Sequence, residues 1–329
     1  MKASQWWPTL PPCTNKADLP TRHAAILQAV RDGHYCPIVW CPVEMVLGQL
    51  HALIGVSSDA FRVGEPGDAW RVPVTPILAQ QIADELSVNH GTPCLLPTAL
   101  LDDLAWNKAA TRIAPHPMTG TEAELKIMAT TARSVEHSAW IDAQLAETNH
   151  EEGFLVRNVG KIWANTPGLW IRSDGGQRGA NYGWHYATNA PLTSPAATSF
   201  GGWCIQPLAY AHDAAHTDYS QTLTLVADEV ILTDHANGET GSVSLASMAL
   251  DNVLCRLVSH EGPVPMRHPG VPCATGGDGT KPPGCPVPWT LPAGGGAVAS
   301  LAPWKRYLPV AVVGVAIGVA GAIAATRRV

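Results

Sequence analysis

Apolar side chains recur at helical spacing through the first 150 residues of the chain. In residues 21–31, Ile26, Leu27 and Val30 fall on one helix face, and Gly33 follows where helices commonly end. Three further helices are expected to begin at capping residues, which are Thr75, Thr98 and Thr121, the last with Glu124 in a capping box. A short hairpin is expected between the earlier helices. The pattern therefore predicts a mainly helical N-terminal half, residues 1–150.

From residue 153 onward the apolar positions form short runs that are typical of β-strands. Clusters of Gly, Asn, Pro and Ser separate these runs, and Asn237–Gly238 has the sequence of a hairpin turn. The expected strands cover residues 156–163, 168–171, 182–186, 203–206, 220–227, 229–233 and 242–245. Helices first and strands second predict an α+β fold, in which an antiparallel β-rich C-terminal half, residues 151–261, packs with the helical part as one globular unit.

The last part of the chain has two different compositions. Residues 262–303 are rich in Pro and Gly and show little apolar periodicity, which indicates a linker. A disulfide between Cys273 and Cys285 would close a small loop within this segment.

Residues 308–326 carry no charged side chain, and cationic residues flank them on both sides. This pattern predicts one C-terminal transmembrane helix within residues 304–329, which would anchor the chain to a membrane of the bacterial envelope or of a phage particle. The alternative is a buried core helix. Several glycines at small-residue spacing would allow a homo-oligomer to form through this helix. The N-terminus lacks the apolar run of a signal peptide.

Composition narrows the classes of function. A hydrophobic share of 46% can build a core, whereas a net charge of −6 without a basic run argues against binding to nucleic acid. The chain has no glycine-rich nucleotide motif, and its eight cysteines lack the spacing of a zinc ribbon. Twelve tryptophans are enough to build a core or to line a cleft.

The densest group of polar residues lies between His212 and Ser220. In an extended strand, His216, Asp218 and Ser220 would point to one side. That arrangement would bring together a general base, a carboxylate and a hydroxyl. The alternative is a half-exposed strand without a chemical role.

A metal site is a further alternative for the same segment. His212 and His216 are four residues apart, as in the helical HExxH motif of zinc hydrolases, but no helix is expected here. His212 and Asp218 with a more distant histidine could still hold a divalent metal such as zinc.

Other candidate site residues lie outside this segment. Lys161 is a lone cation in an apolar strand, and His90 follows the end of a helix. His185 lies in a run of aromatic residues, where it could equally be an exposed strand residue beside a core tryptophan. The candidates for substrate binding are Tyr182, Trp184, Gln206 and Tyr219, and Gln206 could instead cap a strand.

The order NHG…LLPT…APHPM…RNVGK…YGWH…IQPL…H…DYS…LV…VSHEGP over residues 20–268 resembles a family of uncharacterised proteins from bacteria and their phages. The matched positions are Asn89, His90, Lys161, Tyr182, Trp184, His185, Gln206, His212, Asp218, Tyr219 and Ser220. His216 is not among them. Gln221–Thr222 stands where related chains often have His-Gly. The resemblance implies that these residues belong to one site, but it implies no particular activity.

Two functions are expected on these grounds. The first is a membrane-anchored hydrolase of a cell-envelope polymer such as peptidoglycan, in which His212 and His90 act as general bases or metal ligands and Lys161 stabilises negative charge. Asp218 would orient a histidine or bind metal, with His185 and Ser220 as secondary candidates. The second is a non-enzymatic, membrane-anchored structural module, such as a virion component. A weaker third is a sugar- or peptide-binding domain that uses tryptophan faces.

Overall fold

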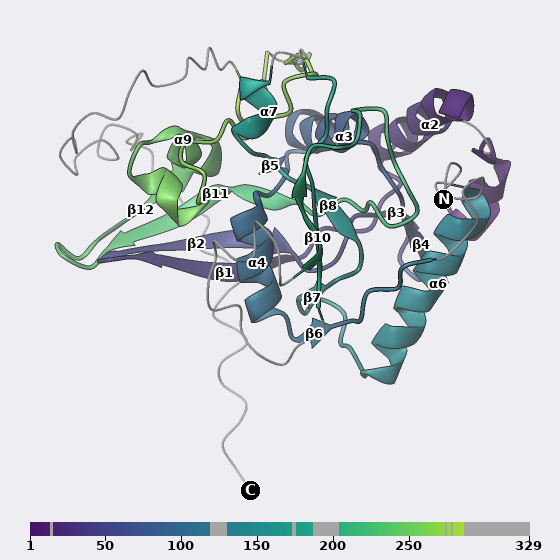
Figure 1. The fold of residues 1–329 in the computed structure, drawn as a ribbon, viewed down its shortest axis with the longest axis horizontal. Coiled ribbons are helices and arrows are strands. Elements are labelled where there is room, and N and C mark those ends of the chain that lie inside the picture. Colours follow the sequence, from purple (N-terminus) through teal and green to yellow (C-terminus); the bar gives the residue numbers. More distant parts are fainter. Residues whose placement is uncertain are drawn as a thin grey trace, which may run out of the picture. The chain divides into compact units, whose positions relative to one another are not determined.

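In the computed structural model, strands from both halves of the chain build the same central sheet (Figure 1). The structure describes residues 1–13, 16–118, 130–172, 176–186, 204–273, 275–277 and 279–285. All of these belong to one compact unit. The architecture is α+β with a β-rich middle.

The central sheet is antiparallel and runs in the order β1-β2-β11-β12, with β5 beside β11. Its strands are β1 (Trp40–Leu47), β2 (Leu50–Ser57), β5 (Cys94–Leu95), β11 (Val226–Asp234) and β12 (Glu239–Ser244). Gly48, with a φ of +61°, turns β1 into β2. Side chains alternate between a buried and an exposed face, so that Leu53 and Ile231 are paired on the exposed one.

Helices and a 3-10 turn contact this sheet. They are α4 (Ala99–Lys108), α9 (Leu245–Leu250) and η3 (Leu254–Leu257). Helix α4 also contacts β9 of a second sheet, so it lies between the two sheets. Its side chains can therefore reach both of them, which matters for the site below.

The main core forms where α2 (Leu19–Arg31) packs against α3 (Pro76–Asn89). Ile26, Leu78 and Ile82 are fully buried there, together with Leu225 from the segment before β11. The N-terminal elements α1 (Ala3–Trp6), η1 (Trp7–Thr9) and η2 (Lys16–Asp18), and the hairpin β3 (Arg62–Glu65) and β4 (Asp68–Arg71), complete this region. The hairpin expected at this point of the sequence is confirmed.

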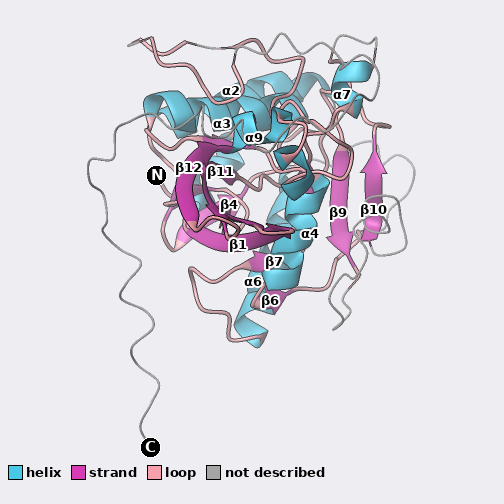
Figure 2. Cartoon of the chain, turned by 90° about the vertical axis from the view of Figure 1, so that its left-hand side faces the viewer, coloured by secondary structure: helices cyan, strands magenta, loops and turns pink. Residues whose placement is uncertain are grey.

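The second sheet is small and antiparallel, in the order β10-β9-β8. Figure 2 shows β9 and β10 side by side at one end of the fold. The strands are β8 (Lys161–Trp163), β9 (Asn181–His185) and β10 (Cys204–Ala209). The neighbouring elements are the parallel pair β6 (Thr111–Arg112) and β7 (Val156–Arg157), and the helices α6 (Thr131–Glu147) and α7 (Gly168–Ile171).

The prediction of a mainly helical N-terminal half followed by a β-rich half is wrong. Strands β1 and β2 lie in the first 60 residues and bury mainly alternate side chains, such as Val43 and Met45, while apolar residues such as Val46 and Leu53 also stand on their exposed face. Strand β2 pairs with β11, which leaves no boundary near residue 150. Residues 168–171 form a helix instead of a strand, and residues 219–225 form a turn and a loop.

The fold class that included a transmembrane helix is also corrected. No helix in the described ranges is both long enough and apolar enough to cross a membrane. The segment at residues 308–326 lies outside the described residues, as do residues 286–303.

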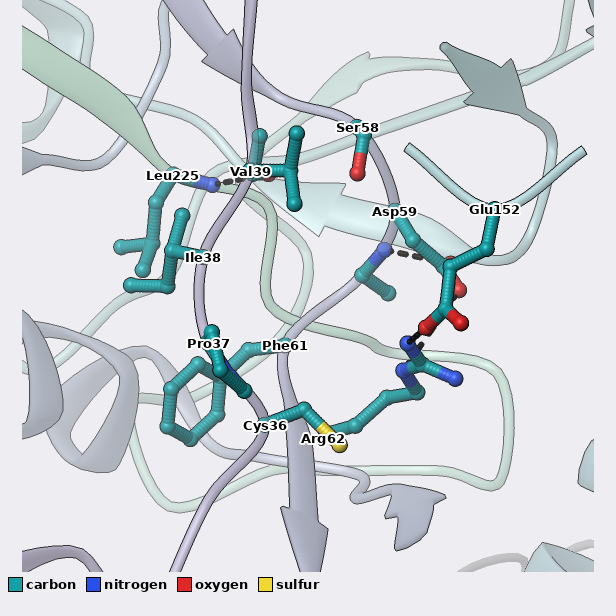
Figure 3. Close-up of a pocket in the computed structure, with 12 residues that line it drawn as sticks. Cys36, Pro37, Ile38, Val39, Ser58, Asp59, Phe61, Arg62, Glu152 and Leu225 are labelled. Carbon is teal, nitrogen blue, oxygen red and sulfur yellow. Dashed lines mark hydrogen bonds and ion pairs between the residues drawn. The ribbon is translucent and has the colours of Figure 1, made fainter. Parts of the chain in front are cut away.

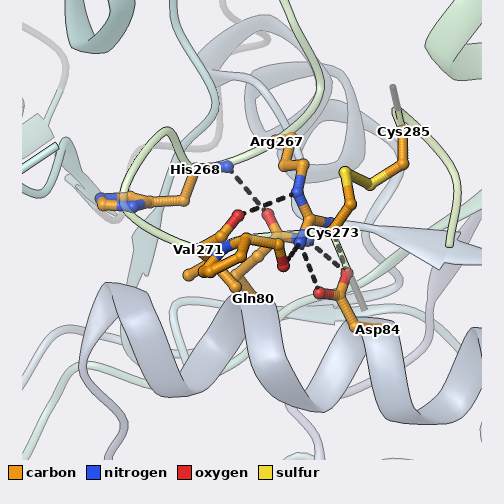
Figure 4. Close-up of a disulfide and its surroundings, with 8 residues drawn as sticks. Gln80, Asp84, Arg267, His268, Val271, Cys273 and Cys285 are labelled. Carbon is orange, nitrogen blue, oxygen red and sulfur yellow. Dashed lines mark hydrogen bonds and ion pairs between the residues drawn. A yellow bond between two sulfur atoms is a disulfide. The ribbon is translucent and has the colours of Figure 1, made fainter. Parts of the chain in front are cut away.

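Part of the Pro- and Gly-rich segment packs against α3 (Figure 4). Arg267 makes two hydrogen bonds of 2.7 Å each to the carboxylate of Asp84, and the His268 amide donates to Gln80 Oε1 at 3.0 Å. The disulfide Cys273–Cys285 is formed beside this contact. Residues 264–268 are buried although they belong to the segment that its composition indicates to be a linker. Composition alone therefore does not show which residues of such a segment pack against the fold.

Candidate functional site

The site is organised around a reversal in strand β9. Gly183 has a φ of +113° and Trp184 a φ of +57°, both in the region that favours glycine. In a regular strand, positions 182 and 185 would face opposite sides. Here Tyr182 and His185 reach the same carboxylate of Asp103, while Trp184 turns to the other side of the strand. A strained non-glycine residue of this kind is frequent at functional sites.

On the α4 side of β9, Asp103 accepts hydrogen bonds from the Tyr182 hydroxyl and from His185 Nε2, the latter at 2.7 Å. The His185 ring stacks on Trp106 with 5.1 Å between ring centres. Asn158 holds the His185 backbone through both its amide group atoms, at 2.9 and 2.7 Å. These contacts fix His185 rigidly in a closed environment, where its side chain is 2% exposed.

The electrostatics of this side disfavour further charges. Burial and the nearby Asp103 and Asp102 carboxylates raise the pKa of the Cys204 thiol to about 12, and they raise that of Tyr182 as well. Burial also raises the pKa of Asp102. Cys204 therefore stays a thiol at neutral pH and is not an activated nucleophile. The residues on the α4 side of β9 therefore hold this strand in place.

On the opposite side of β9, Lys161 Nζ lies 2.5 Å from Asp218 Oδ2. The two side chains are only 11% and 6% exposed. Asp218 Oδ1 accepts from the Ser220 amide at 2.8 Å and from the Ser220 hydroxyl at 2.7 Å. These bonds form an Asx turn, because the aspartate side chain bonds to the backbone two residues ahead. The prediction that residues 216, 218 and 220 share one face of a strand is therefore wrong.

The backbone holds this turn against β8. The Lys161 amide donates to the Ser220 carbonyl at 2.7 Å, and the Thr222 amide donates to the Lys161 carbonyl at 3.0 Å. A Cβ on Gly160 would lie 2.5 Å from the Ser220 carbonyl oxygen and 2.5 Å from Thr222 Oγ1. Only glycine fits at this position, so the glycine before Lys161 allows the close approach.

Aromatic rings cover the ion pair. The Trp184 ring centre lies 5.5 Å from Lys161 Nζ and 6.3 Å from the Tyr219 ring. His137, from α6, lies 5.2 Å from Tyr219 between ring centres. The Tyr219 hydroxyl accepts from the Met118 amide at 2.6 Å. These rings exclude water from one side of the ion pair, which strengthens its electrostatics.

Two histidines lie next to the ion pair. His212 and His216 stack with 4.0 Å between their ring centres, and His212 also lies against Trp163, the neighbour of Lys161 on the same face of β8. Both are half-buried, so the site meets solvent there. Burial and the neighbouring His212 lower the pKa of His216 to about 4. At neutral pH His216 is therefore uncharged.

Burial alone would raise the pKa of Asp218. The Lys161 ammonium and the hydrogen bonds from Ser220 outweigh this effect and lower the pKa below its ordinary value. Asp218 is thus a carboxylate at neutral pH, and it holds the lysine ammonium in a fixed position.

Several buried polar atoms in this region have no hydrogen-bond partner among the described residues. They are Trp184 Nε1, His216 Nε2, Gln221 Nε2, Thr222 Oγ1, and both Nδ2 and Oδ1 of Asn181. Asn181 is paired with Trp163, so the two side chains share the face that carries Lys161. Buried polar groups are nearly always bonded, and a group of exceptions indicates a place for water or a ligand.

The remaining sequence candidates are His90, far from the ion pair, and Gln206, whose position on β10 is paired with Gly183 of β9. His90 caps the end of α3 and packs edge-on against Tyr35. Trp163 donates to Val74, just before the start of this 14-residue helix, so His90 lies about 20 Å further along the helix axis. Gln206, on β10, donates to the neighbouring Pro207 carbonyl at 2.9 Å.

The described ranges contain no group of three or more His, Cys, Asp or Glu side chains that could hold a metal ion. His212 and Asp218 therefore lack a third ligand of these types there. Asp218 already bonds Lys161 and Ser220 through its two oxygens.

Several residues around Asp103 and around the Lys161–Asp218 pair were not predicted from the sequence. Asp102 and Asp103 form an acidic pair between apolar residues of α4, and that contrast was a usable signal. His137 and Asn181 join the site through contacts with distant segments, and no local pattern marks them. Gln221 joins it through the local bond from the Asp218 amide to its Oε1 at 2.8 Å.

A separate pocket near Cys36 is lined by Ile38, Phe61, Arg62 and Glu152, among others (Figure 3). Arg62 and Glu152 close one side of it through a bond of 2.7 Å. Its cavity volume of about 40 Å³ leaves room for only a few water molecules. Burial raises the pKa of the Cys36 thiol, so this pocket provides neither space nor a nucleophile for a reaction.

Comparisons with protein-family models, curated proteins and solved structures found no match for this chain. The function must therefore be argued from the site itself.

Proposed function

We propose that the protein is a hydrolase of a cell-envelope polymer such as peptidoglycan, acting at the centre that Lys161 and Asp218 form. The observation that carries the proposal is the buried Lys161–Asp218 pair, surrounded by polar atoms that have no partner among the described residues. A fixed ammonium group in a water-poor site is suited to stabilise negative charge that develops on a substrate oxygen.

Each neighbouring group has a role in this proposal. Asp218 holds the ammonium of Lys161, and the Ser220 bonds hold Asp218. The imidazoles of His212 and His216, at the solvent side, transfer protons between water and the substrate. Trp184 offers an aromatic ring beside hydrogen-bond donors, which suits a polymer with both apolar faces and polar groups.

The first test uses the full-length chain and dye-labelled peptidoglycan sacculi. Lys161→Met keeps most of the side-chain volume and removes the charge, so release of dye should fall at least about 100-fold. Lys108→Met, at an exposed position on α4, should release dye like the wild type. His212→Ala and added EDTA are run in parallel, because a metal-dependent reaction would stop with EDTA. No release from a folded wild-type protein would refute the proposal.

A second candidate is a non-enzymatic structural module. The observation that favours it is the complete burial of Ser220 and the mutual pairing of Lys161 with Asp218, which a purely structural network would also show. In that case Lys161→Met would lower the stability of the protein, and neither the variant nor the wild type would release dye.

A further inference from the structure

The hydrogen-bonding character of the unpartnered atoms differs from that of a site for glycosidic bonds. Trp184 Nε1 and Gln221 Nε2 are donors, and Lys161 adds an ammonium group. Donors in a buried site suit a carbonyl oxygen, and still more the oxyanion that forms when such a carbonyl is attacked.

Asn181 adds a second, independent observation. Its side chain is fully buried, and both its donor Nδ2 and its acceptor Oδ1 are unpartnered among the described residues. A carboxamide with both functions open is complementary to another amide, which offers one N–H and one C=O. A glycosidic oxygen offers only an acceptor.

The register of the sheet places this carboxamide near the ion pair. Trp163 is paired with Asn181, and Lys161 is paired with Gly183, so the two positions are two residues apart along the strands. That separation is roughly 7 Å, about the repeat of two residues in an extended peptide. An extended peptide could therefore meet Lys161 with one amide and Asn181 with a following one.

The carboxylates near the ion pair also disfavour cleavage of a glycosidic bond. Glycosidic cleavage generally uses two carboxyl groups that flank the bond, one of them protonated as the acid. Asp218 is bonded to Lys161 and Ser220 and has no proton to give. Asp102 and Asp103 lie across β9, and the exposed Asp213 accepts from the Ala215 amide at 3.0 Å.

We infer that the bond cleaved at the Lys161 centre is an amide in the peptide part of the polymer rather than a glycosidic bond. This inference rests on the proposed function. In the reaction, a water oxygen bonds to the acyl carbon and the carbonyl becomes an oxyanion beside Lys161. The C–N bond then breaks, and a proton from the water passes to the leaving nitrogen. The products are a carboxylic acid and an amine.

The test incubates the full-length protein with unlabelled sacculi and measures two products, new free amines and new reducing sugar ends. We expect amines to increase while reducing ends stay constant. Lys161→Met should lower amine release at least about 100-fold, and Asn181→Leu about 10-fold, the equivalent of one lost hydrogen bond. Asn252→Leu, at an exposed position, is the control and should match the wild type.

The outcomes separate the two proposals. New reducing ends without new amines would overturn the amide inference and leave the hydrolase standing. Neither product from folded protein would refute the hydrolase itself. If Asn181→Leu releases amines like the wild type, the assignment of Asn181 to the substrate is wrong, because removal of an unpartnered buried carboxamide would then affect stability alone.

Discussion

His137 is an uncharged histidine enclosed by aromatic rings. Its side chain is 2% exposed and lies 5.2 Å from Tyr219 and 6.2 Å from Trp184 between ring centres. Burial lowers its pKa to about 3, compared with about 6.5 in an unfolded chain. Unfolding therefore takes up a proton at pH values between these two. The stability that the uncharged His137 gives to the folded protein is therefore complete above pH ~6.5 and is lost as the pH falls toward 3.

We predict that His137→Phe weakens the pH dependence of stability. Between pH 6 and 4, the free energy of unfolding of the wild type should fall about 1.4 kcal/mol per pH unit more steeply than that of the variant. Urea unfolding at several pH values measures this difference. His235→Gln, at an exposed position, should keep the wild-type slope. Equal slopes for His137→Phe and the wild type would contradict the prediction.

At the scale of residues, the sequence identified one part of the site and not the other. Lys161, Trp184, Asp218 and Tyr219 stood out by residue type, and the structure brings them together. Their mutual arrangement was not predictable, because it depends on an Asx turn and on a reversed strand. His137 lies about 80 residues from Tyr219 in sequence, and only the packing of α6 joins them.

The reversal in β9 is the element that separates the two polar groups. It sends Tyr182 and His185 toward Asp103 and Trp184 toward Lys161. The space around Gly183 is open, since a Cβ would meet its nearest neighbour, Asp102 Oδ2, at 3.5 Å. The constraint at this position is therefore the backbone conformation rather than crowding.

We predict that Gly183→Ala lowers the free energy of unfolding by roughly 1–3 kcal/mol, because alanine is strained at this φ. Gly277→Ala, where a Cβ meets nothing within 4 Å and φ is ordinary, is the matched control. Chemical denaturation of both variants measures the difference. If both variants unfold like the wild type, β9 can form the reversal without glycine.

Helices were predicted better than strands for a physical reason. Thr75 and Thr98 cap α3 and α4 as their sequences indicate, because capping is a local interaction. Strands β1 and β2 were missed because their outward positions carry residues as different as Glu44 and Val46. These strands form a sheet because β2 pairs with β11, and the sequence around β1 and β2 carries no information about that distant partner.

At the scale of the molecule, a buried ion pair and the His268–Gln80 hydrogen bond hold the segment after residue 262 to α3. Arg267 and Asp84 are 3% and 7% exposed, and the Cys273–Cys285 disulfide lies next to them (Figure 4). Removing one partner of such a pair leaves the other charge buried without compensation. This contact is therefore a point on which the stability of the whole unit depends.

We predict that Arg267→Met lowers the free energy of unfolding by about 3–5 kcal/mol. Arg256→Met, at an exposed position, should change it by less than about 0.5 kcal/mol. Thermal and urea unfolding of the oxidised protein measure both effects. A small effect of Arg267→Met would mean that the segment is held by its apolar contacts and the His268–Gln80 hydrogen bond instead.

The class of the fold was predictable, and its long-range organisation was not. The α+β class follows from the presence of both patterns, but the sequence order suggested two halves. Pairing of β2 with β11 removes that division, and nothing local in either strand identifies the other. Contacts between distant segments are set by the complementary packing of their side chains in the assembled core.

The pairing of β2 with β11 has a consequence during synthesis. Leu53 can pair with Ile231 only after roughly 180 further residues have been synthesised. At ~5–20 residues per second, synthesis of these residues takes about 10–35 seconds. Until then the hairpin of β1 and β2 has an open edge, and such edges attract other strands. Nascent chains on neighbouring ribosomes would expose the same edge, so a chaperone that shields it should improve the yield of this protein more than one that acts after release.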